Sequence, residues 1–231
     1  MKWESQGLIF SKKNFPKWNI THAWVPTPIM IKKSICRVYY AGRNKNNMSQ
    51  IGAFDIDLNN PKKIRKVFKK PLLELGKRGH FDDCAVIPSH IFKVKNIFYM
   101  FYAGWTQAKT VPYITSIGLA VTKNLNVKFK RYSDAPVLGR TKNDPIFTSS
   151  CFVQKNKKMY KMFYTSNLSW GVKNNNIQPK YTIKEASSNN LVNWKYKSVT
   201  LTHKRGEIAI TRPWIYNDNS IEKMLYSYRS N

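Results

Sequence analysis

Apolar residues along this chain occur in short runs that are separated by polar turns. The runs are four to nine residues long, rich in β-branched and aromatic types, and bounded by Asn, Gly, Pro, Lys and Ser, which is typical of β-strands. In NIFYMFYAGW, residues 96–105, both faces are apolar, so we expect this strand to be buried between neighbours. No window has the spacing of an amphipathic helix. The pattern predicts an all-β protein.

The aromatic run recurs at a constant interval. RVYYAGR, NIFYMFYAGW, KMYKMFYTSN and EKMLYSYRS align on four tyrosines that are each 62 residues apart, Tyr40, Tyr102, Tyr164 and Tyr226. Each of the first three copies contains four strand-like runs, which is enough for a four-stranded unit. The fourth copy contains two. Four-stranded units in a radial repeat are typical of a β-propeller, and solenoid repeats are usually shorter.

We therefore predict one β-propeller domain over residues 1–231, built from four-stranded antiparallel blades. The expected blades are 20–76, 80–140, 144–203 and an incomplete 207–231, with 3–10 as a closing strand.

Composition excludes several classes of protein. The 231 residues are 42% apolar and carry a net charge of +28, so the chain can bury a core and attract polyanions. The basic residues are spread evenly, without a nucleic-acid-binding motif, so no specific nucleic-acid partner is expected. No apolar run is long enough to span a bilayer, and the first residues lack a signal-peptide core. Three scattered cysteines fit a reducing compartment, so a cytoplasmic location is expected.

The block NIFYMFYAGW…TSIGLAVTKNLNVKFKR, with a second copy in IKEASSNNLVNWKYK, resembles the five-bladed β-propeller glycoside hydrolases of the arabinanase and invertase type. The order of MKW, GLIF, ELG, FDD and RPWI is similar to uncharacterised members encoded among surface-polysaccharide genes. The resemblance implies a carbohydrate substrate. Some members of the superfamily hold a central cation near a histidine placed like His22, but we predict no cofactor and no metal for this chain. Five blades would need roughly 310 residues, so the resemblance implies a C-terminally truncated copy with about 3.5 blades.

Acidic residues are scarce, 12 against 40 Lys and Arg, and four of them precede inner strands. These are Asp82, Asp83, Asp144 and Glu207. In the 62-residue register Asp82 matches Asp144, and Asp83 matches Glu207, so all four are candidates for the central channel. Glycoside hydrolysis needs two carboxyl groups beside the scissile bond. By resemblance, Glu207 is the general acid and Asp82 or Asp83 the second carboxylate, with Asp144 a weaker catalytic candidate.

Each acid also has a plainer interpretation, because Asp and Glu before a strand often cap a turn. The first blade offers Thr21, His22 and Trp24 in place of an acid, which puts hydrolysis in doubt. Substrate-binding candidates are His22, Trp24, Trp105 and Arg212, because aromatic rings stack on sugars and arginine binds anionic groups. His80, His90 and His203 are expected at the surface or in loops.

Four functions remain open. The first is glycoside hydrolysis of a surface or related glycan, and the second is non-catalytic glycan binding or scaffolding. The third is phosphorolysis of a glycoside, for which Arg212, Arg43 and Arg229 could form a cationic cluster. The fourth is electrostatic binding of a polyanion, which salt would weaken steeply. Carboxyl groups of Asp83 and Glu207 about 5 to 10 Å apart in the channel would favour hydrolysis, and turn-capping roles would favour binding.

Overall fold

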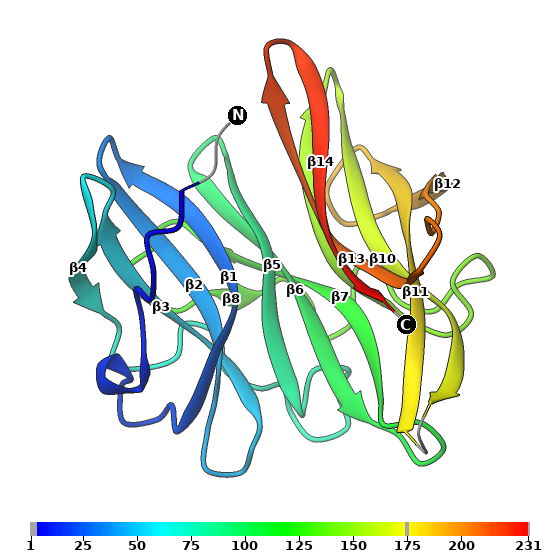
Figure 1. The fold of residues 1–231 in the computed structure, drawn as a ribbon, viewed down its shortest axis with the longest axis horizontal. Helices are drawn as coiled ribbons and strands as arrows, with labels where there is room; N and C mark the ends of the chain where they lie inside the picture. Colours follow the sequence, from blue (N-terminus) through cyan, green and yellow to red (C-terminus); the bar gives the residue numbers. More distant parts are fainter. Residues whose placement is uncertain (1–3, 174–175, 231) are drawn as a thin grey trace.

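The computed structural model describes residues 4–173 and 176–230, which form β-strands and one short 3-10 helix, η1 (Lys12–Asn14) (Figure 1). The strands are β1 (Thr21–Lys32), β2 (Ile35–Arg43), β3 (Ser49–Asp57), β4 (Asn60–Val67), β5 (Ala85–Val94), β6 (Ile97–Gln107), β7 (Tyr113–Thr122), β8 (Lys130–Arg131), β9 (Thr148–Asn156), β10 (Met159–Lys173), β11 (Asn176–Ser188), β12 (Lys195–Leu201), β13 (Glu207–Asp218) and β14 (Ile221–Ser230). Within the described residues, no helix has the length and apolar character needed to cross a membrane.

The strands pair in chain order, as the strands of propeller blades do. Antiparallel pairing runs in the orders β1-β2-β3-β4, β5-β6-β7-β8, β9-β10-β11-β12 and β13-β14. One parallel bridge, Ser49 to Ala85, connects the first two blades. The first strands contact each other in succession, β1 with β5, β5 with β9 and β9 with β13. Figure 1 shows the blades following one another in chain order from blue to red. The prediction of an all-β propeller is confirmed.

The two apolar faces of an aromatic strand pack on different blades. On β6, Met100 and Tyr102 belong to a buried cluster that includes Tyr39 of the first blade. The intervening Phe101 belongs to a second cluster that includes Val153 of the third blade. Burying one such side chain contributes about 1.5–3 kcal/mol. The alternation of large apolar residues therefore fixes each blade between two neighbours.

A glycine opposite the repeat tyrosine makes room for its ring. Tyr40 pairs with Gly52 and Tyr102 with Gly118 across adjacent strands. A Cβ added at Gly118 would lie 2.3 Å from the Tyr102 ring, and one at Gly52 would lie 2.8 Å from the Tyr40 ring. These tyrosine rings can lie flat across the next strand only because no side chain stands there.

The N-terminal segment differs from its prediction as a closing strand over 3–10. Trp3 lies outside the described residues, and residues 4–10 form no strand. Phe10 instead stacks on Phe54, with 4.1 Å between ring centroids, and packs near Tyr40. The segment covers the apolar face of the first blade that is opposite to the face packed on the second blade.

His90, expected at the surface or in a loop, is buried in β5 with 8% of its surface exposed. Its Nδ1 accepts a hydrogen bond from the backbone amide of Val153 at 3.2 Å. Its ring packs on Phe152, with 4.2 Å between centroids. Burial lowers the pKa of His90 to about 3. The neutral ring therefore belongs to the interface between the second and third blades.

Lowering the pH from 7.5 to 5 should reduce the free energy of unfolding by about 2 kcal/mol through His90. Above pH 6.5, the ordinary pKa, neither state protonates this ring. Between pH 6.5 and about 3 the unfolded chain binds a proton that the buried ring does not, so stability falls with pH. Urea unfolding at both pH values measures the change.

The matched control is His90→Asn, because the asparagine oxygen can still accept the Val153 amide but does not titrate. The pH-dependent part of the unfolding free energy should shrink by about the same amount in this variant. An unchanged pH dependence would show that His90 is not its source.

Candidate functional site

All four inner strands are bulged where they pass the centre of the propeller. The pairing register shifts between Trp24 and Thr27, between Pro88 and His90, between Thr148 and Cys151, and between Thr211 and Trp214. Within these bulges Val25 and Arg212 have φ values of 58° and 56°, which such side chains adopt only when the surrounding structure imposes them. Bulges re-aim side chains, and these bulges direct residues into the channel.

A cavity of about 250 Å³, the channel cavity, lies between the inner strands. Four lining residues are 62 positions apart and represent every blade: Val25, Ile87, Ser149 and Thr211. The rest of the wall consists of Trp24, Ala103, Trp105, Tyr113, Ser150, Tyr181 and Arg212. The cavity therefore combines large aromatic surfaces, hydroxyl groups and one guanidinium.

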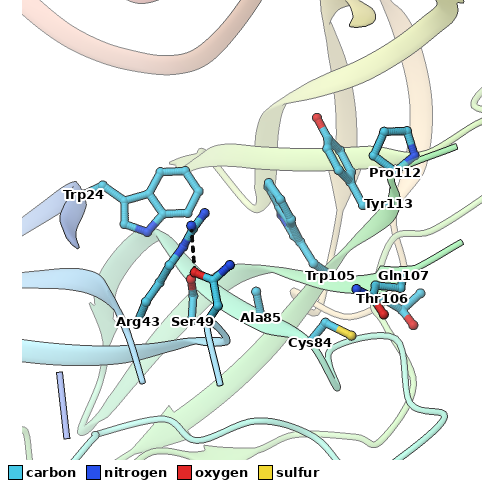
Figure 2. A pocket seen from close by; sticks show the side chains of 11 residues that line it. Trp24, Arg43, Ser49, Cys84, Ala85, Trp105, Thr106, Gln107, Pro112 and Tyr113 are labelled. Carbon is cyan, nitrogen blue, oxygen red and sulfur yellow. Dashed lines mark hydrogen bonds between the residues drawn. The ribbon is translucent and has the colours of Figure 1, made fainter. Parts of the chain in front are cut away.

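A second cavity of about 190 Å³, the mouth pocket, adjoins the channel cavity and shares Trp24, Trp105 and Tyr113 with it. Figure 2 shows Trp24 and Arg43 on one side, with Trp105 and Tyr113 facing them. The Trp24 and Trp105 rings meet edge to face, with centroids 6.0 Å apart, and Trp105 stacks on Tyr113 at 4.3 Å. The Arg43 guanidinium lies 5.8 Å from the Trp24 ring centre and donates to Asn47 at 3.0 Å.

Hydroxyl groups line the third-blade side of the channel cavity. The Ser150 hydroxyl lies 3.0 Å from that of Thr165 and 3.2 Å from that of Thr211. The hydroxyls of Tyr113 and Tyr181 lie 2.9 Å apart. Burial raises the pKa of Tyr113, which the Tyr181 contact partly offsets. These groups remain protonated and can donate or accept hydrogen bonds.

The carboxylates predicted to face the channel make other contacts. Asp82 is fully buried, and its Oδ2 accepts hydrogen bonds from the Tyr102 hydroxyl at 2.9 Å and from Arg131 Nε at 2.8 Å. Its backbone oxygen accepts the Gly76 amide at 3.0 Å. The Asp82 side chain has no surface on either cavity.

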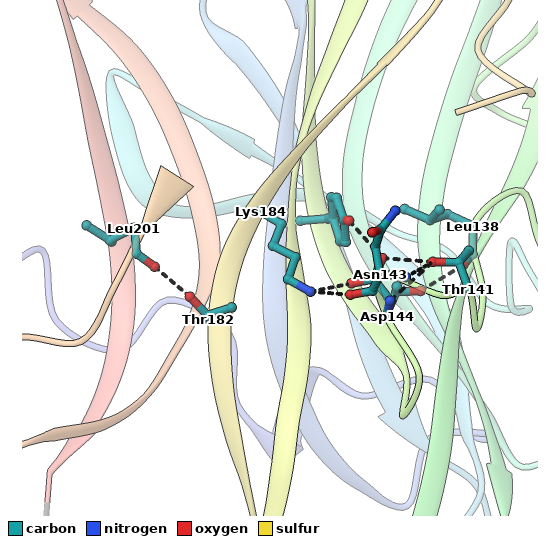
Figure 3. Close-up of polar contacts among 9 residues, drawn as sticks. Leu138, Thr141, Asn143, Asp144, Thr182, Lys184 and Leu201 are labelled. Atoms are coloured by element: carbon teal, nitrogen blue, oxygen red, sulfur yellow. Dashed lines mark hydrogen bonds and ion pairs between the residues drawn. The ribbon is translucent and has the colours of Figure 1, made fainter. Parts of the chain in front are cut away.

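Asp144 makes the equivalent contact in the third blade. Its Oδ2 accepts the Tyr164 hydroxyl at 2.9 Å, and its Oδ1 lies 3.1 Å from Lys184 Nζ. Figure 3 shows Lys184 reaching from β11 to the turn that holds Thr141, Asn143 and Asp144. Lys184 is the cross-strand partner of Tyr164, at the position that glycine has in the first two blades. Its ammonium supplies the charge that Arg131 supplies to Asp82.

Glu207 contacts the repeat tyrosine of the fourth blade. Its Oε1 accepts the Tyr226 hydroxyl at 3.0 Å, and its Oε2 accepts the Lys204 amide at 2.8 Å. Glu207 thus corresponds to Asp82, although the 62-residue register had matched it with Asp83. The register failed here because 19 residues separate Glu207 from Tyr226, whereas 20 separate Asp82 from Tyr102. The hydrogen bond from Lys204, with that from Tyr226, lowers the pKa of Glu207, whereas a glycosidase general acid needs a raised pKa.

Asp83 caps a turn. Its Oδ2 accepts the amide of Gly79 at 2.9 Å, and Gly79 has a φ of +85°. Burial acts to raise the pKa of Asp83, and the hydrogen bonds from Gly79, Cys84 and Thr106 outweigh it, so the pKa is lowered. Cys84 and Thr106 line the mouth pocket, so Asp83 is a neighbour of that pocket without lining it.

No carboxylate lines the channel cavity or the mouth pocket in the described part of the chain. The other acids pair elsewhere, except Glu4, which is exposed. The pairs are Asp55 with Arg37, Asp57 with Arg65, Glu74 with Lys128, Asp134 with Lys77, Glu185 with Lys161, Asp218 with Lys223, and Glu222 with Gln154. Within residues 4–173 and 176–230, no group of three or more His, Cys, Asp or Glu could hold a metal ion.

Of the predicted binding residues, Trp24, Trp105 and Arg212 line the channel cavity. His22 is exposed, and its Nδ1 lies 2.9 Å from the Thr21 hydroxyl. Sequence reasoning did not single out the channel residues Val25, Ile87, Ser149 and Thr211, or the tyrosines Tyr113 and Tyr181. The 62-residue register holds a signal for the first four, because it relates them to one another, but it does not identify a bulge.

The architecture is a β-propeller fold, which is also the fold of several solved glycoside hydrolases. The chain is similar to a glycoside hydrolase with a TM-score of 0.72 and 18% identity, covering 93% of this chain and 68% of that one. It is similar to the Cellvibrio cellulosa α-L-arabinanase, solved with arabinohexaose, with a TM-score of 0.65 and 14% identity; the match covers 90% of this chain and 69% of that one. It is also similar to the Bombyx mori GH32 β-fructofuranosidase BmSUC1, with a TM-score of 0.63 and 16% identity; the match covers 95% of this chain and 45% of that one.

None of the protein-family models matches the chain. The chain is 32% identical over 231 residues to the uncharacterised proteins Rv1502 and MT1551 from two Mycobacterium tuberculosis strains, H37Rv and CDC 1551. The match covers 99% of this chain and 76% of each relative. The chain belongs to the family of these proteins, and it spans about three quarters of their length.

Replacing Tyr102 by Phe should lower the free energy of unfolding by about 1.5–3 kcal/mol, because it removes a hydrogen bond to the fully buried, charged Asp82. Tyr226→Phe is the matched comparison, since Glu207 is partly exposed and water can replace the lost hydroxyl. It should have the smaller effect. Chemical denaturation of both variants measures this, and equal losses would contradict the structural role of Asp82.

Proposed function

We propose that this chain is a glycan-binding β-propeller that holds a sugar at the mouth of its central channel without cleaving it. The observation that supports this most is the composition of the two adjoining cavities, which offer aromatic rings, hydroxyls and arginine but no carboxylate. Sugars pack their apolar C–H faces on aromatic rings, and convergent polar groups fix their orientation. Resemblance to proteins encoded among surface-polysaccharide genes favours a surface glycan.

The placement of the acids favours binding over hydrolysis. Hydrolysis requires two carboxyl groups that flank one glycosidic bond. Asp83 and Glu207 instead accept backbone amides of their own turns, and the carboxylates of Asp82 and Asp144 bond to repeat tyrosines. All four support the loops that lead into inner strands, which is a structural task.

Trp24→Ala and Trp105→Ala should each weaken glycan binding by about tenfold or more, because each removes a large contact surface. A glycan array with the intact chain would first identify a binding sugar, and titration calorimetry would then compare the variants. Trp194→Phe is the matched control, because Trp194 packs between the second and third blades, away from both cavities. Equal affinity in all variants would exclude the proposed site.

Glycoside hydrolysis is the second candidate, favoured by the fold and by Asp83 adjoining the mouth pocket. On this hypothesis Asp82, Asp83, Asp144 and Glu207 include the catalytic pair. We expect no turnover of a panel of aryl glycosides above that of a heat-denatured sample. Turnover that is lost in both Asp83→Asn and Glu207→Gln, with folding intact, would overturn the binding-only function.

A further inference from the structure

The arginines at the channel differ from buried arginines elsewhere in the chain. Arg37 pairs with Asp55 at 2.7 Å, and Arg131 with Asp82 at 2.8 Å. Arg43 and Arg212 have no ion pair with any described residue. Arg43 donates to the neutral side chain of Asn47, and Arg212 donates to the backbone oxygen of Pro26 at 3.3 Å. Two guanidiniums, from β2 and β13, therefore adjoin the same aromatic cluster without a counter-ion.

Arg212 is also partly removed from water. Burial lowers the pKa of its guanidinium from the ordinary value. Removing a cation from water is unfavourable unless an opposite charge compensates, and no carboxylate lines either cavity in the described residues. A negatively charged group bound in the channel would supply that compensation.

The mouth pocket offers further donors that lack acceptors. Trp24 Nε1, Trp105 Nε1 and Arg43 Nε are buried and have no hydrogen-bond partner among the described residues. Indole and guanidinium groups only donate. Such unmet donors are costly when buried, so an acceptor-rich group would satisfy several at once. Carboxylate and phosphate oxygens are acceptors of this kind, and arginine binds both through paired N–H groups.

We propose that the glycan bound here is acidic, and that its carboxylate or phosphate group lies in the mouth pocket between Trp24, Arg43 and Trp105, with Arg212 supplying a second positive charge from the channel. This inference rests on the proposed glycan binding and names the class of sugar. It assigns Arg43 and Arg212 to the anion, and it assigns to the sugar ring those surfaces of the stacked Trp105–Tyr113 pair that line the mouth pocket.

The test compares acidic probes with neutral partners of the same shape. The pairs are tri-galacturonic acid with its methyl ester, glucuronic acid with glucose, and glucose 6-phosphate with glucose, with inorganic phosphate alone as a further probe. Quenching of tryptophan fluorescence reports binding, because two tryptophans line the pocket. The salt concentration is held at about 0.15 M, where long-range attraction is screened.

At least one acidic probe should bind about tenfold or more tightly than its neutral partner. Arg43→Gln and Arg212→Gln should remove most of that preference, and Arg212→Lys should retain part of it. Lys62→Gln is the matched control for loss of one positive charge, because Lys62 is exposed on the outermost strand of the first blade. Thermal unfolding confirms that each variant is folded.

Other outcomes separate this inference from the proposed function. Equal binding of acidic and neutral probes, lost in Trp24→Ala, would overturn the acidic-sugar inference and leave glycan binding intact. Arginine-dependent binding of inorganic phosphate, with no gain from any sugar, would support the anion pocket and overturn glycan binding. An acid preference reduced as much by Lys62→Gln as by the arginine variants would overturn the site, because the net charge alone would explain it. No binding of any probe would overturn both.

Discussion

The hydrogen bond between a repeat tyrosine and the acid that precedes an inner strand is the contact on which the rest of the structure depends. Tyr102 binds Asp82, Tyr164 binds Asp144, and Tyr226 binds Glu207. Each contact joins the second strand of a blade to the beginning of its first strand or to the loop just before it. The direction and depth of the inner strand are thereby fixed, and the inner strands form the channel.

The first blade shows how far this contact can vary. Asn19 lies against Gly42 as Asp82 lies against Gly104, since a Cβ on either glycine would meet that side chain within 2.6 Å. An amide therefore takes the place of the carboxylate beside Tyr40. The first blade has no acid at its entrance, which the sequence suggested was a sign against hydrolysis. The structure shows that this position belongs to the set of side chains that lie beside the repeat tyrosines. The missing acid therefore says little about the channel, because Asn19, Asp82, Asp144 and Glu207 line neither cavity.

Separation of the acids from the channel has an electrostatic consequence. The chain has 40 Lys and Arg against 12 acids. Each carboxylate that pairs with a cation inside the blades is therefore missing from the rest of the protein, where the excess of positive charge becomes larger. Asp82 and Asp144 neutralise Arg131 and Lys184 inside the blades, whereas Arg43 and Arg212 adjoin the aromatic cluster without an acid. The channel therefore offers hydrogen-bond donors and positive charge, which attract an anionic partner.

The repeat could be recognised in the sequence because strand pairing and blade packing require the same residue types at the same interval. The spacing of Tyr40, Tyr102, Tyr164 and Tyr226 was sufficient for the fold, and the scarcity of acids drew attention to Asp82, Asp144 and Glu207. Trp24, Trp105 and Arg212 were predicted as binding residues, and all three line the channel cavity, although the sequence could not show that cavity.

What the sequence determined by itself was the periodic part of the protein: the strands, the blades and the series of acids and tyrosines. Only the tertiary structure decided which way side chains point where the period is broken. A β-bulge adds a residue to one strand and reverses the faces that follow it. The stretch from Glu207 to Tyr226 is one residue shorter than the equivalent stretches from Asp82 and Asp144, so a fixed register assigned Glu207 to the wrong equivalent. It also left Val25, Ser149 and Thr211 unnoticed. The channel is built at those bulges, and its chemistry therefore depends on backbone geometry that no local pattern encodes.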